Sequence, residues 1–99
     1  MYTNIAAWIK SKACYQTLEE LANQLGLSEN MVEGLLNGEV CPTFKELVHI
    51  MAGLNLNTEE TLELFSLVAA ALELSPISIY ESVVSEIVIM TEQQSKSFV

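Results

Sequence analysis

Signals for the start and the end of a helix recur along this chain at short intervals, and they restrict it to a series of short helices. Thr17 with Glu20, and Thr43 with Glu46, have the spacing of a capping box. In that pattern a hydroxyl and a glutamate satisfy the free backbone amides of a helix start. Gly26 follows the apolar positions of the first of these helices, and glycine readily adopts the left-handed backbone that ends a helix. The chain is therefore predicted to be all-α.

Apolar residues between these signals recur at spacings of three and four, as on the buried face of a helix. Six helices are predicted, over residues 4–14, 18–25, 29–36, 44–52, 58–74 and 76–91. The apolar face of the last helix is expected to consist of Ile77, Tyr80, Val83, Val84, Ile87 and Val88. Residues 86–90 are rich in β-branched side chains and could form a short strand instead. The continuous spacing from Ile77 favours the helix.

A length of 99 residues indicates one domain. Residues 4–56 are expected to form its core, residues 57–92 C-terminal helices for packing or dimerisation, and residues 93–99 a frayed polar tail. No run of about 18 apolar residues predicts a membrane span. The first residues also lack the basic and apolar regions of a signal peptide, so we expect the protein in the cytoplasm and not in a membrane.

The sequence does not indicate catalytic or metal-binding residues. Cys14 and Cys41 lie far apart and are expected to be reduced thiols, and His49 is the only histidine, so a metal site lacks ligands at suitable spacing. Aspartate is absent, which excludes a Ser-His-Asp set. We expect no enzymatic activity and no cofactor.

The charge is the most unusual feature of the composition. The net charge is −9, from thirteen acidic residues that are all glutamate and four lysines, and arginine is absent. Lys and Arg supply most of the affinity for nucleic acid, because they neutralise phosphates and release counterions. The composition therefore disfavours DNA and anionic membrane surfaces, and it favours a protein partner.

From Thr17 to Leu56 the chain resembles the Cro/C1 repressor (Xre-type) helix-turn-helix family. The matching positions are Thr17, Glu20, Leu21, Ala22, Leu25, Gly26, Leu27, Ser28, Val32, Leu35, Asn37, Gly38, Pro42, Thr43, Leu47, Gly53 and Leu54. With the first helix, the resemblance covers about residues 4–56. It implies a five-helix Cro/C1-repressor-like helix-turn-helix domain, to which this chain adds a C-terminal helix.

In this family the opening of the third helix enters the major groove of DNA. The resemblance therefore implies DNA contacts by Ser28, Asn30 and Asn37, and phosphate contacts by Lys10, Lys12 and Lys45. Two functions follow. One is a DNA-binding transcriptional regulator that depends on dimerisation. The other is an acidic protein-interaction module on the same scaffold, which binds another regulator or itself without binding DNA.

The fifth predicted helix is apolar nearly all round, and such a helix must be covered on most sides. Either the sixth helix covers it within one chain, or both helices form the interface of a homodimer. We expect the homodimer, with an interface formed by Leu64, Leu67, Val68, Leu72, Tyr80, Val84 and Ile87.

Overall fold

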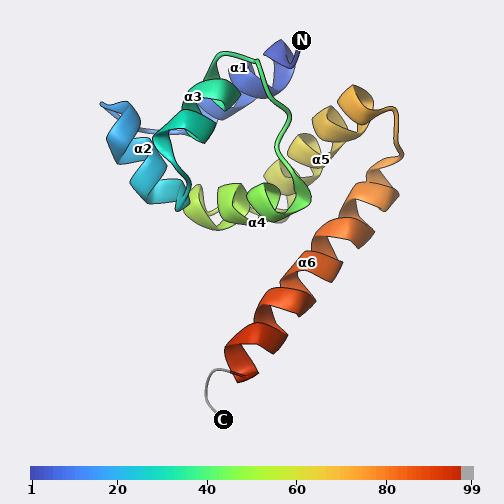
Figure 1. Ribbon diagram of the computed structural model, residues 1–99. Helices are drawn as coiled ribbons and strands as arrows, with labels where there is room; N and C mark the ends of the chain where they lie inside the picture. Colours follow the sequence, from blue (N-terminus) through green and yellow to red (C-terminus); the bar gives the residue numbers. More distant parts are fainter. Residues whose placement is uncertain (97–99) are drawn as a thin grey trace.

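Six α-helices account for most of residues 1–96, which are the residues that this computed structural model describes (Figure 1). They are α1 (Thr3–Lys12), α2 (Leu18–Leu25), α3 (Glu29–Leu36), α4 (Phe44–Gly53), α5 (Thr58–Leu72) and α6 (Pro76–Lys96). These residues contain no strand, so residues 86–90 are helical and the all-α prediction is confirmed. The Cα radius of gyration is 13.6 Å, close to the ~13 Å of a compact domain of this length.

One apolar core lies between the helices. α1 packs against α3 and α5, α2 packs against α3 and α4, and α6 crosses α4 and α5 (Figure 1). The core residues are Ile5, Ile9, Leu21, Ala22, Leu25, Val32, Leu35, Leu36, Leu47, Ile50, Leu64, Phe65, Val68, Ala69, Ile79 and Val83. Trp8, a predicted core anchor, is half-buried at the edge of this core, where its indole can still reach a polar partner.

Each of the helices from α2 to α5 begins with a side chain that accepts a hydrogen bond from a backbone amide three residues later. At Thr43 the predicted capping box is complete, because Glu46 also accepts from the Thr43 amide. At Thr17 only half of the predicted box forms, since the hydroxyl accepts from Glu20 but no return bond is present. Asn57 and Glu60 form a second complete box, which the sequence analysis did not identify.

A residue with a left-handed backbone stands at the C-cap, or directly after it, in four helices. Gly26 has φ 68° and Gly38 has φ 73°, and the following amides return to carbonyls five residues earlier. Asn55, with φ 51°, and Glu73, with φ 58°, adopt the same conformation after α4 and α5. Glycine adopts this conformation without steric penalty, whereas Glu73 carries a Cβ that disfavours it.

Glu73→Gly is therefore expected to raise the free energy of unfolding by about 1 kcal/mol, because it relieves the left-handed strain at the end of α5. Urea denaturation measures this change. Ser66→Gly is the control, since Ser66 is an exposed residue inside α5, and there glycine should lower stability by roughly 0.5 kcal/mol. A Glu73→Gly protein that is no more stable than the wild type would contradict this account of the helix end.

Gly53 does not end α4 by adopting a left-handed backbone. It is the last residue of α4 and has no left-handed backbone. A Cβ at this position would lie 2.7 Å from the carbonyl oxygen of Gln24 and 2.9 Å from the Cα of Leu25. The Gln24 side chain also donates a 2.9 Å hydrogen bond to the Gly53 carbonyl. Gly53 is required because the ends of α2 and α4 pass each other at backbone contact.

The structure determines which side of α6 packs within the chain, a question that the sequence left open. Ile79 and Val83 are buried against α4 and α5. Of the predicted apolar face Val83 lies in the core, whereas Ile77, Tyr80, Val84, Ile87 and Val88 are exposed. The helix has apolar residues on two faces, so spacing alone did not decide which face packs. α6 also continues to Lys96, past the predicted start of the frayed tail, and residues 97–99 of that tail lie outside the described residues.

A sharp change of direction separates the two C-terminal helices. The axes of α5 and α6 are bent by 109° at the short break between them (Figure 1). Within residues 1–96, no helix by itself has the length and apolar character needed to cross a membrane. α5 and α6 meet that test of length and composition only when they are combined across this bend.

Candidate helix-turn-helix interface

The two helices that the sequence assigns to a helix-turn-helix are joined by a three-residue turn, residues 26–28. Gly26 makes the bend, and the Leu27 amide donates a 3.0 Å hydrogen bond to the Ala22 carbonyl. Ser28 then starts α3 by accepting from the Met31 amide at 3.2 Å. The predicted pair of short helices with a tight bend at Gly26 is thus present in the structure.

Buried residues fix the angle between these helices. Leu21 and Leu25 from α2 and Val32 and Leu35 from α3 all enter the core with exposures of 2 % or less. Ala22, 4 % exposed, is small enough to let the two helices approach each other. Because these apolar side chains face inward, the outer sides of α2 and α3 present polar residues to solvent.

This outer surface is acidic. Glu19 and Glu20 on α2, Glu29 and Glu33 on α3, and Glu39 after α3 are all exposed, and we call them the acidic α2–α3 surface. No lysine or arginine occurs between Lys12 and Lys45 in the sequence. Residues 13–44 therefore contribute five exposed negative charges and no positive charge.

The predicted base-contact residues occupy both ends of α3. Asn30 is exposed in the first turn, next to the Ser28 cap. Asn37 is exposed at the C-terminal end, where it lines a shallow groove together with Thr3 and Lys10 of α1. The structure thus brings Asn37 and Lys10 together, at the end of α3 farthest from Ser28 and Asn30. Lys45 is exposed in the first turn of α4.

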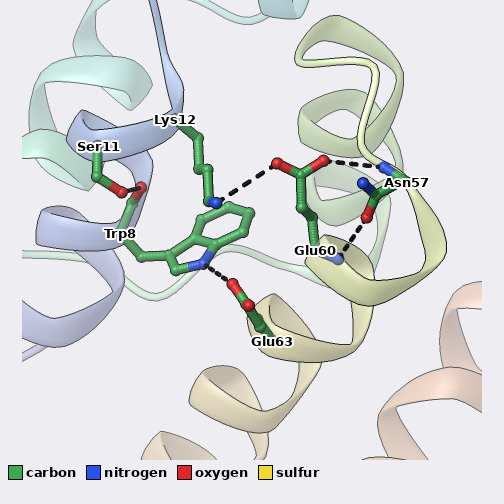
Figure 2. Close-up of polar contacts among 6 residues, drawn as sticks. All are labelled: Trp8, Ser11, Lys12, Asn57, Glu60 and Glu63. Atoms are coloured by element: carbon green, nitrogen blue, oxygen red, sulfur yellow. Dashed lines mark hydrogen bonds and ion pairs between the residues drawn. The ribbon is translucent and has the colours of Figure 1, made fainter.

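Lys12 is engaged within the chain, on a different side of α1 (Figure 2). Its ammonium group lies 3.4 Å from the Glu60 carboxylate and 5.9 Å from the centre of the Trp8 ring. The Trp8 indole N–H donates a 3.1 Å hydrogen bond to Glu63. The four residues connect α1 with α5. Lys12, a predicted phosphate contact, is therefore partly neutralised by Glu60.

Glu60 takes part in two interactions at once. Its carboxylate accepts a 3.1 Å hydrogen bond from the Asn57 amide in the capping box and also faces Lys12 (Figure 2). The hydrogen bond from the Asn57 amide lowers the pKa of the Glu60 carboxyl, and the nearby Lys12 ammonium lowers it further. Glu60 consequently stays ionised at the start of α5, where the helix dipole also favours a negative charge.

Gly34 is a buried residue of α3. A Cβ at Gly34 would lie 3.1 Å from a methyl group of Val40. The glycine therefore lets the segment after α3 pack closely on this helix. Because of this packing, position 34 is not accessible to a binding partner.

The predicted dimer residues divide between core and surface. Leu64 and Val68 have exposures of 0 % and lie in the core of a single chain, and Leu67 is half-buried. Leu72, Tyr80, Val84 and Ile87 are exposed. The surface that a second copy could reach therefore lies mostly on α6. Ile77 and Val88, which the sequence placed on the same apolar face as these residues but not among the dimer residues, are also exposed there.

The two thiols are separate and free. Cys14 is exposed, and Cys41 is half-buried. Burial raises the pKa of the Cys41 thiol, and the charge of Glu46 raises it further, so this thiol stays protonated at neutral pH. Among residues 1–96, no three His, Cys or Glu side chains gather in a way that could hold a metal ion.

No family model, curated protein or solved structure matches this chain.

Proposed function

We propose that this protein is a regulatory module on a helix-turn-helix scaffold, and that its acidic α2–α3 surface binds a basic protein partner without binding DNA. The observation that supports the proposal is the charge of that surface, with five exposed glutamates and no lysine or arginine from residue 13 to residue 44. The two short helices α2 and α3 and the bend at Gly26 support the helix-turn-helix scaffold.

Electrostatics favours the protein-binding function over DNA binding. A carboxylate about 4 Å from a phosphate is repelled by roughly 1 kcal/mol in water, and more where water is excluded. A helix-turn-helix docked on DNA would place several of the five glutamates near phosphates, without releasing counterions in return. A basic protein surface meets the same glutamates with attraction, and complementary charge also accelerates association.

DNA binding is the second candidate function, and one local feature favours it. Asn30 and Ser28 are exposed at the N-terminal end of α3, the end that reads bases in helix-turn-helix proteins. An asparagine can form two hydrogen bonds with adenine. Lys10, beside Asn37 at the other end of α3, would then contact a phosphate. With so few cations, DNA binding would require two copies of the chain.

Two measurements separate these functions. A labelled mixed-sequence DNA duplex should show no change in fluorescence anisotropy with micromolar protein at low salt, because the surface repels phosphates. Immobilised protein should retain a lysine- and arginine-rich protein from a lysate of its source, and added salt should weaken that complex. Tight DNA binding together with no basic protein retained would contradict the proposal.

A matched pair of variants locates the binding surface. The first carries Glu19→Gln, Glu29→Gln and Glu33→Gln, and the second carries Glu59→Gln, Glu81→Gln and Glu92→Gln. Both remove three negative charges from exposed positions, but only the first changes the acidic α2–α3 surface. We expect at least a tenfold loss of affinity for the retained protein in the first variant and near wild-type affinity in the second. Equal losses in both variants would indicate a non-specific effect of net charge.

A further inference from the structure

The outward side of α6 carries an apolar stripe that nothing in the part of the chain described by the structure covers. Its members and their exposed fractions are Ile77 at 69 %, Tyr80 at 57 %, Val84 at 39 %, Ile87 at 41 % and Val88 at 48 %. We call these five residues the outer stripe. Residues 77, 80, 84 and 87 follow the alternating spacing of three and four that lines the contact between two paired helices.

The stripe has the size that a helix pair needs. Five side chains at these exposures present on the order of 500 Å² of apolar surface. A standard protein interface buries about 800 Å² on each partner, and homodimer interfaces are about 65 % apolar. The outer stripe alone therefore supplies roughly the apolar area of one side of a stable dimer.

We propose that the outer stripe pairs with the same stripe of a second copy, with the two α6 helices antiparallel across a two-fold axis at the level of residue 82, between Tyr80 and Val84. In this register each residue faces the residue at the same distance on the other side of position 82. Ile77 then faces Ile87, and Tyr80 faces Val84. A closed two-fold contact of this kind uses one self-complementary surface on both copies.

The helix dipoles favour the antiparallel direction. An antiparallel pair places the positive N-terminal end of each α6 beside the negative C-terminal end of the other, whereas a parallel pair places like ends together.

Light scattering coupled to size-exclusion chromatography tests the association. The wild type should elute at micromolar concentration with about twice the chain mass of 10.9 kDa. Val84→Glu should elute with the mass of one chain, because it places a charge at the centre of the stripe. Ser85→Glu makes a similar change at the next residue, which is exposed but outside the stripe, and it should leave the dimer intact. A monomeric wild type, or a dimer in Val84→Glu, would overturn the proposal.

Cross-linking tests the direction. In a chain with Cys14→Ser and Cys41→Ser, a short bis-maleimide should link two Val84→Cys copies in high yield. Ile77→Cys copies should not be linked, because the two cysteines would lie about 15 Å apart along antiparallel helices. Efficient linking of Ile77→Cys copies would show a parallel pair instead, and linking of Ser85→Cys copies as efficient as that of Val84→Cys copies would show that the stripe is not the contact.

This inference does not depend on the proposed function. Val84→Glu leaves the acidic α2–α3 surface unchanged, so a monomeric variant can still be assayed for a basic partner. Salt also distinguishes the two contacts. Screening should strengthen a dimer of chains that each carry a net charge of −9, whereas it should weaken a complex with a basic protein. Loss of one contact with retention of the other identifies which proposal has failed.

Discussion

Replacing Gly53 with alanine is expected to lower the free energy of unfolding by about 2–3 kcal/mol. The new Cβ would lie 2.7 Å from the Gln24 carbonyl oxygen and 2.9 Å from the Leu25 Cα. These are backbone atoms, so α2 and α4 must move apart to accommodate the methyl group. The free-energy cost of separating the helices would exceed the gain of about 1 kcal/mol that alanine brings inside a helix.

Urea denaturation followed by circular dichroism measures this loss. Gln24→Ala is the control, because it removes the side-chain hydrogen bond to the Gly53 carbonyl without adding an atom between the helices. It should cost no more than about 1 kcal/mol. A Gly53→Ala protein as stable as the wild type would show that α2 and α4 are not held at backbone contact.

Ile79→Ala should destabilise the fold by about 2–5 kcal/mol, whereas Ile77→Ala, two residues earlier, should change it by less than about 0.5 kcal/mol. Both changes remove the same atoms from the same helix. Ile79 has an exposure of 0 % against the core, and Ile77 has an exposure of 69 %. The difference between the variants therefore measures which face of α6 packs within the chain.

The comparison belongs in a Val84→Glu background, so that pairing of α6 with a second copy does not add to the stability of either protein. Thermal and urea unfolding should give the same order. Equal losses at the two positions would mean that the inward face of α6 is not the one formed by Ile79 and Val83.

Local signals in the sequence predicted most of the helix starts and stops. Thr17, Ser28, Thr43 and Gly26 act where their chemistry places them, because a cap depends only on residues within one turn. Packing between residues distant in sequence was harder to predict from local patterns. The need for Gly53 comes from the Gln24–Leu25 backbone, which is distant in sequence, and no local pattern encodes that approach.

The sequence left the rotation of α6 about its axis open for a related reason. A helix with two apolar faces offers two solutions, and only the packing of α4 and α5 selects Ile79 and Val83 over Ile77 and Val84. At the candidate interface, the sequence predicted the exposed acidic residues of α2 and α3. It did not predict that Lys12 would face Glu60 on α5 or that Gly34 would be buried against Val40.

The outer stripe and the acidic α2–α3 surface occupy different helices, with α5 and the bend of 109° between them in the chain. Self-association through α6 would thus leave both copies of the acidic surface open to solvent. Such a particle is bivalent. A target with two basic patches at matching separation would bind the second patch at a high effective concentration, and its residence time would exceed that of a target with one patch.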